Sequence, residues 1–121
     1  MRFRVLVAGV ALAACSGGSQ LARDLHSAES SCDKDWPTKS QFVACLDSKD
    51  RQVWAKEEPA TLDLYDRFAR RRDALARDFD QKEIDEHQYL ERLHKLKHET
   101  RAQMAARRGQ NSEPDQAPAQ P

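Results

Sequence analysis

The sequence has little net charge, few glycines and no long apolar run. Its 20 Lys and Arg residues balance 20 Asp and Glu residues. Without residues 1–14, which hold Arg2 and Arg4, the balance is 18 against 20, a net charge of −2. A nucleic-acid-binding protein shows a clear basic excess on one face, so we expect no nucleic-acid partner.

Signatures of catalysis are also missing. The four glycines form no phosphate-binding loop, and no Gly-x-Ser-x-Gly motif occurs. We therefore expect no enzyme activity, cofactor or small-molecule substrate. The 107 residues left after residues 1–14 (121 less 14) suffice for one small domain. We expect such a domain to lack the volume for a buried pocket of ~300 Å³ or more.

The longest apolar run is Val5–Ala14, which follows Met1, Arg2 and Arg4. Ten helical residues span ~15 Å, about half of a ~30 Å hydrocarbon core, so this run cannot cross a membrane. A basic start, a short apolar stretch and small residues before a cleavage point are typical of a secretory signal peptide. We expect residues 1–14 to be that signal.

A cysteine stands directly after this stretch. The segment Leu12-Ala13-Ala14-Cys15 resembles the lipobox of bacterial lipoproteins. The resemblance implies that Cys15 carries lipid on its thiol and, after cleavage, on its amino group, which anchors the chain in the cell envelope facing the periplasm. By resemblance to lipoprotein sorting in enteric bacteria, Ser16 implies the outer membrane. Residues 15–31 are mostly small and polar and are expected to be a flexible tether.

Two cysteines remain, Cys32 and Cys45. In an exported protein such a pair most simply forms a disulfide, which stabilises a small domain. The alternatives are a zinc site, which needs more ligands than two cysteines, and redox catalysis, which usually requires Cys-x-x-Cys.

Helix signals dominate the rest of the chain. Thr38 and Gln41 have capping-box spacing, and Glu57-Glu58-Pro59 should end the helix that they start. Apolar residues recur every three or four positions over Leu62–Phe79 and again over Glu86–Arg108, where Leu90, Leu93, Leu96 and Met104 share a face. Asp85 with Gln88, and Ile84 with Tyr89, mark the start of the last helix.

These signals predict an all-α fold. A short disulfide-stapled helix is followed by an antiparallel helical hairpin, residues 62–108, within a domain of residues 32–108. Residues 109–121 are expected to be a disordered tail. The run Leu75–Leu93 is similar to the hairpin of SHOCT-type modules, which implies oligomerisation or partner contact. Lys82 stands there in place of the glycine of the turn. The same run resembles a degenerate Leu-Thr-x-x-Gln motif of periplasmic stress chaperones.

Several residues are candidate binding sites. Arg72 falls on the apolar face of its helix, so it should either pair with Asp47 or Asp50 or mark a contact with another protein. Trp36 and Trp54 either pack in the domain or contact a partner. His87, Glu91, His94 and His98 form one stripe, which is a candidate metal site or a solvated face.

The domain has few large apolar side chains, so we expect it to rely on its disulfide, its anchor and a partner. The sequence therefore predicts a lipid-anchored periplasmic protein that acts through protein–protein contact, as an accessory or assembly factor, with self-association as one form of that contact. The alternatives are a metal- or stress-sensing helical protein and an exclusion- or inhibitor-type surface lipoprotein.

Overall fold

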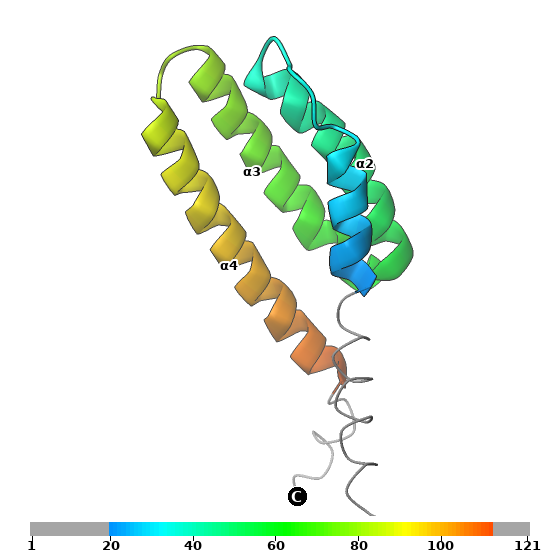
Figure 1. Cartoon of the computed structure of the whole chain (residues 1–121). Coiled ribbons are helices and arrows are strands. Elements are labelled where there is room, and N and C mark those ends of the chain that lie inside the picture. The colour runs from blue at the N-terminus through cyan, green and yellow to red at the C-terminus, as the bar shows by residue number, and fades with distance from the viewer. Residues whose placement is uncertain (1–19, 113–121) are drawn as a thin grey trace, which may run out of the picture.

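The computed structural model describes residues 20–112, which form helices joined by short connections (Figure 1). The helices are residues 20–30, α2 (Lys39–Glu57), the short 3₁₀ helix η1 (Pro59–Thr61), α3 (Leu62–Asp80) and α4 (Glu86–Ser112). No β-strand occurs in this range. α3 packs against both α2 and α4, and α3 and α4 run antiparallel. The predicted all-α fold and helical hairpin are confirmed.

The N-terminal tether is shorter than expected, because residues 20–30 are helical. Leu21, Asp24, Leu25 and Ala28 are half-buried, and their spacing of three and four places them on one face of this helix. The sequence signal was weak because only two of the four are large and apolar. The predicted signal peptide, Cys15 and residues 16–19 lie outside the described residues.

A disulfide joins Cys32 to Cys45, as predicted, with 5.9 Å between the Cα atoms. Cys32 directly follows the helix of residues 20–30 and is fully buried. Cys45 lies in the second turn of α2. The bond therefore fastens the end of the first helix to α2 and holds the two side by side.

The start of α2 has two sets of capping groups. Thr38 Oγ1 accepts a hydrogen bond from the Gln41 amide at 3.2 Å, as its capping-box position predicted. The Asp80 carboxylate, from the far end of α3, accepts bonds from the amides of Lys39 and Ser40, both at 2.9 Å. Ser40 Oγ also donates to it at 2.6 Å. Asp80 thus links the last turn of α3 to the first turn of α2, a contact across 40 residues of chain.

The turn between α3 and α4 begins with Lys82 in the left-handed region, at a φ of 62°. The Lys82 amide donates to Phe79 O at 3.0 Å, and the Glu83 amide donates to Asp78 O at 2.9 Å. This is the Schellman arrangement that ends many helices, usually with glycine at the left-handed position.

The start of α4 follows the prediction closely. Asp85 Oδ1 accepts from the Gln88 amide at 2.8 Å, and Gln88 Oε1 accepts from the Asp85 amide at 3.0 Å. Ile84 and Tyr89 are both buried, as a hydrophobic staple requires. The predicted capping box and staple are confirmed.

Two expectations for α4 are wrong. The helix continues through Gly109 to Ser112 instead of ending near Arg108. Gly109 is helical and does not take the left-handed conformation that would end the helix. Leu90 is 56% exposed and does not share the buried face of Leu96 and Met104. That face follows Tyr89, whose staple position fixes the rotation of the helix. Residues 113–121 of the expected tail lie outside the described range.

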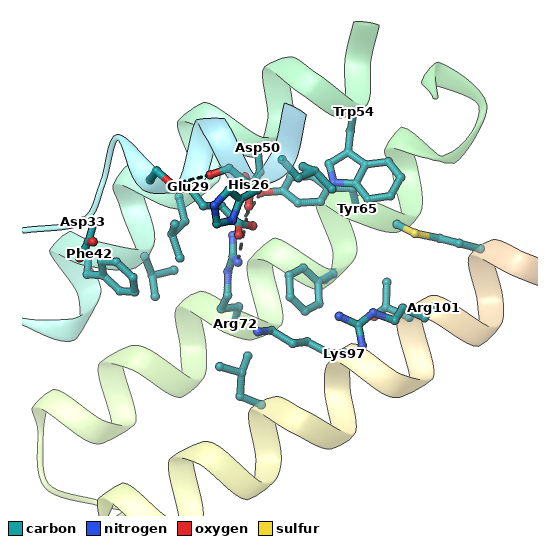
Figure 2. A pocket seen from close by; sticks show the side chains of 18 of the residues that line it. His26, Glu29, Asp33, Phe42, Asp50, Trp54, Tyr65, Arg72, Lys97 and Arg101 are labelled. Atoms are coloured by element: carbon teal, nitrogen blue, oxygen red, sulfur yellow. Dashed lines mark hydrogen bonds and ion pairs between the residues drawn. The ribbon is translucent and has the colours of Figure 1, made fainter. Parts of the chain in front are cut away.

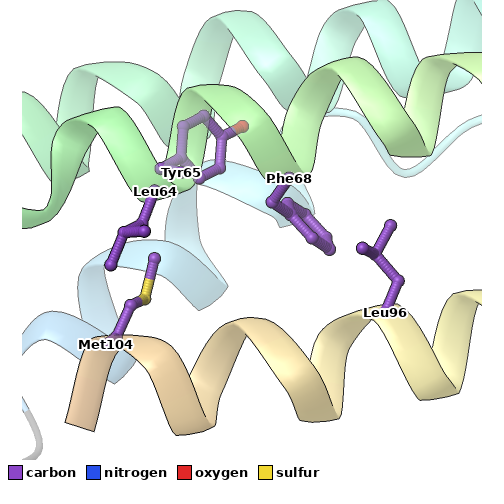
Figure 3. Close-up of a cluster of buried hydrophobic side chains, with 5 residues drawn as sticks. All are labelled: Leu64, Tyr65, Phe68, Leu96 and Met104. Atoms are coloured by element: carbon purple, nitrogen blue, oxygen red, sulfur yellow. The ribbon is translucent and has the colours of Figure 1, made fainter. Parts of the chain in front are cut away.

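The main core lies between α3 and α4 (Figure 3). Its buried members are Leu64, Tyr65, Phe68, Leu96 and Met104, with Trp54 and Leu93 packed beside them. None of the helices in residues 20–112 is long and apolar enough to span a membrane.

Candidate partner-binding groove

A groove of about 520 Å³ runs between the helix of residues 20–30 and α2 on one side and α4 on the other, with α3 as its floor (Figure 2). It opens to solvent, because exposed residues of the first helix and of α4 line its edges. This space is an open groove and not the buried pocket of ~300 Å³ or more that the sequence argues against. Helices that both pack on α3, and scarcely on each other, leave this space between them.

The groove is lined largely by aromatic and aliphatic side chains. The Trp54 and Tyr65 rings are stacked with their centroids 6.1 Å apart, and Phe68 follows Tyr65 at 6.1 Å. Opposite them, α4 contributes Leu93 and Met104. Tyr65, Phe68 and Met104 are already buried, whereas Trp54 and Leu93 are half-buried and keep apolar area that a partner can remove from water.

Arg72 lies in the floor of the groove and is 4% exposed. Its Nη2 donates to Asp47 Oδ1 at 2.6 Å and to Tyr65 Oη at 3.2 Å. Its Nη1 lies 4.0 Å from Asp50 Oδ2, and its guanidinium carbon lies 4.8 Å from the centroid of the Phe68 ring. Pairing with Asp47 and Asp50 is one of the two outcomes expected for this arginine, and it explains how the charge is tolerated on an apolar face.

Asp50 is 2% exposed, and burial raises its pKa to about 8. The neighbouring Glu29 raises the pKa further through a hydrogen bond and its charge, while Arg72 lowers it. Burial and the nearby Asp47 likewise raise the pKa of Asp73 to about 6. Near neutral pH the Asp50 carboxyl is therefore mostly protonated, so the floor of the groove presents a neutral acid beside a cation.

Two buried polar atoms in this floor, Asp50 Oδ1 and Arg72 Nε, have no hydrogen-bond partner within residues 20–112. A buried unpaired donor or acceptor costs ~1–3 kcal/mol.

The two edges of the groove carry opposite charges. Glu29 and Asp33 are exposed on the edge formed by the first helix and the turn after it. Lys97 and Arg101, one helical turn apart, are exposed on the α4 edge. Neither cation forms an ion pair or side-chain hydrogen bond within the described part of the chain. The other arginines of α3 and α4 include several paired ones, such as Arg107 with Asp63 at 2.8 Å.

The other predicted site residues lie in different places. Trp54 lines the groove, whereas Trp36 is half-buried near the disulfide, where its Nε1 donates to Cys32 O at 2.8 Å. The stripe of His87, Glu91, His94 and His98 is exposed along α4. Among residues 20–112, no group of three or more His, Cys, Asp or Glu side chains is arranged to hold a metal ion.

Sequence reasoning missed the groove and its charged edges. Glu29 was assigned to the tether, and Lys97 and Arg101 were not distinguished from other surface cations. The sequence contains one signal for the charged cluster in the floor of the groove. Asp47 and Asp50 lie three residues apart, on the same side of a helix, and both are within reach of Arg72. Comparison with protein-family models, curated proteins and solved structures finds no match to this chain.

Proposed function

We propose that this chain is a lipid-anchored protein of the bacterial cell envelope that acts by binding another protein. The anchor is lipid on Cys15, and the folded domain faces the periplasm, with Ser16 directing the chain to the outer membrane. The proposal includes no catalytic step. The anchor is supported by three features that follow one another in the sequence: the basic start, the apolar run and Leu12-Ala13-Ala14-Cys15.

The observation that carries the binding role is the open groove along α3. Its lining includes the half-buried aromatic residues Phe42 and Trp54, and the unpaired cations Lys97 and Arg101 stand at its edge. Uncovered apolar surface with a charged edge is typical of a protein-binding site. In the floor of the groove the buried Arg72 pairs with the half-buried Asp47 at 2.6 Å, which holds the guanidinium in place.

Two measurements test the proposal. Metabolic labelling with an alkyne analogue of palmitate should label the wild-type chain and leave Cys15→Ser unlabelled. Chemical crosslinking in intact cells, read by mass spectrometry, should join the domain to a specific envelope protein. A wild-type chain without lipid contradicts the anchor, and a folded domain without reproducible crosslinks contradicts the binding role.

A further inference from the structure

We propose that the groove binds one amphipathic α-helix of the partner protein, with acidic residues on one flank and basic residues on the other. This inference rests on the proposed function and names the site and the kind of partner. Its acidic flank lies against Lys97 and Arg101, and its basic flank lies against Glu29 and Asp33.

The groove has the length of a short helix. On α4 its lining runs from Tyr89 to Met104, and on α2 from Phe42 to Trp54. At ~1.5 Å per residue these are distances of ~22 Å and ~18 Å. A helix of about 14 residues, nearly four turns, covers that length. Its apolar residues at positions i, i+3, i+4 and i+7 lie on one face, as groove-binding helices require.

Glu29 and Lys97, one charge from each edge, lie at the same level along the groove. α2 begins at Lys39 and α4 at Glu86, both at the same end of the domain (Figure 1). Asp50 and Lys97 each lie 11 residues from these starts (50 less 39, and 97 less 86), or ~16 Å along the groove. Glu29 interacts with Asp50, which places it at that level too. One helix can therefore face both edges at once.

The charge pattern favours a helix over other occupants. A fatty acid carries charge of one sign and would leave one edge unmet. A second copy facing the groove would bring two concave surfaces together and leave the space between them empty. A helix with split flanks meets both edges and fills the groove.

The same pattern fixes the direction of the bound helix. Turning a helix end for end exchanges its left and right flanks, so only one direction sets acids against Lys97 and Arg101. Exchanging the two flanks of a peptide should therefore reverse its direction and leave its affinity unchanged. A peptide with acidic and basic residues mixed on each flank should bind more weakly in either direction.

The test uses residues 15–121 with Cys15→Ser, a chain that contains every element of the structure. Trp36→Phe leaves Trp54, in the groove, as the fluorescent reporter, because the chain has two tryptophans. The probes are two 18-residue helical peptides of identical composition without tryptophan. One has Glu on one flank and Lys on the other, and its isomer mixes them on both flanks. We expect the split peptide to bind about tenfold tighter, which four exposed charge pairs supply.

Charge reversal in the protein checks the assignment of the edges. Lys97→Glu with Arg101→Glu should abolish the preference for the split peptide. Adding Glu29→Lys and Asp33→Lys should restore the preference for the split peptide, which should then bind in the opposite direction. A spin label at one end of the peptide would report that direction. The matched control is Arg92→Glu with Lys95→Glu, cations of α4 that line the opposite side of the α3–α4 contact, and it should change nothing.

Other outcomes overturn the proposal. Equal binding of the two peptides, or no effect of reversal at Lys97 and Arg101, shows that the edges do not select a helix. Dimerisation of the free protein that is lost on the same reversal assigns the groove to a second copy. Saturation of the Trp54 signal by palmitate assigns it to a lipid. Envelope crosslinks that persist in the reversed variant leave the proposed function standing and move the contact to another face.

Discussion

At the scale of single residues, the most informative side chain is Asp50, a buried acid between Glu29 and Arg72. Burial raises its pKa from 3.8 to about 8, so the folded chain holds a proton there that the unfolded chain has lost. Between pH 3.8 and about pH 8, the free energy of unfolding is therefore largest at the acidic end and falls as the pH rises toward 8. Asp73, with its pKa raised to about 6, adds to the same trend below pH 6.

We expect the melting temperature to fall by about 5 °C or more between pH 5.5 and pH 8, since 1 kcal/mol shifts it by ~4–8 °C in a domain of this size. Asp50→Asn keeps the shape of the protonated carboxyl without its titration and should remove most of this fall. Thermal unfolding by circular dichroism at several pH values measures both. Identical pH profiles for the two proteins would contradict the assignment to Asp50.

Lys82 stores a small amount of backbone strain at the turn before α4. Its φ of 62° costs an ordinary residue ~1–2 kcal/mol relative to glycine. Lys82→Gly should therefore stabilise the fold by ~0.5–1 kcal/mol, after the greater freedom of glycine in the unfolded chain is subtracted. Urea unfolding measures the change. Lys82→Ala is the control and should give no gain, because alanine has the same Cβ.

At the scale of elements, the helix of residues 20–30 depends most on its surroundings. Helices shorter than ~12–15 residues are marginal in isolation, and this one has 11 residues. The disulfide between Cys32 and Cys45, 13 residues apart in sequence, fastens its end to α2. A loop of that size contributes ~3 kcal/mol, mainly by restricting the unfolded chain.

Cys32→Ser with Cys45→Ser should therefore release this helix first. We expect amide hydrogen exchange within residues 22–30 to speed up more than exchange within α3, whose central residues Tyr65, Phe68 and Arg72 stay buried. Binding of the split peptide should fall in the same variant, because Glu29 leaves the groove edge. Equal acceleration in all helices would show instead that the disulfide supports the domain as a whole.

The elements that were predictable from sequence are those whose signals are local. Thr38, Asp85 and Gln88 cap their own helices, so residues within four positions reveal each start. Asp80 caps α2 from 40 residues away, and nothing near it in sequence indicates that role. The groove depends on how α2 and α4 sit around α3. The charges that edge it, such as Glu29 and Lys97, could not be distinguished from other surface charges.

At the scale of the whole molecule, the position of residue 20 constrains how the domain meets a membrane. That residue, the α2–α3 connection and the end of α4 lie at one end of the molecule (Figure 1). Cys15 precedes residue 20 by five residues (20 less 15), which reach at most ~17 Å. The proposed lipid on Cys15 would therefore keep this end near the bilayer and leave the groove on the side of the domain, accessible to a partner on the same membrane.

Anchoring at that distance raises the concentration of the domain around a membrane-bound partner, so a contact too weak for solution becomes occupied. A periplasmic form with Cys15→Ser and a cleavable export signal should fold with the same helix content and lose at least ~90% of its envelope crosslinks, a tenfold change in occupancy. The same domain behind an unrelated lipoprotein signal should recover them, because only proximity has been restored. Crosslinking at the wild-type level by the soluble form would show that the groove binds tightly without the anchor, and the lipid would then serve location alone.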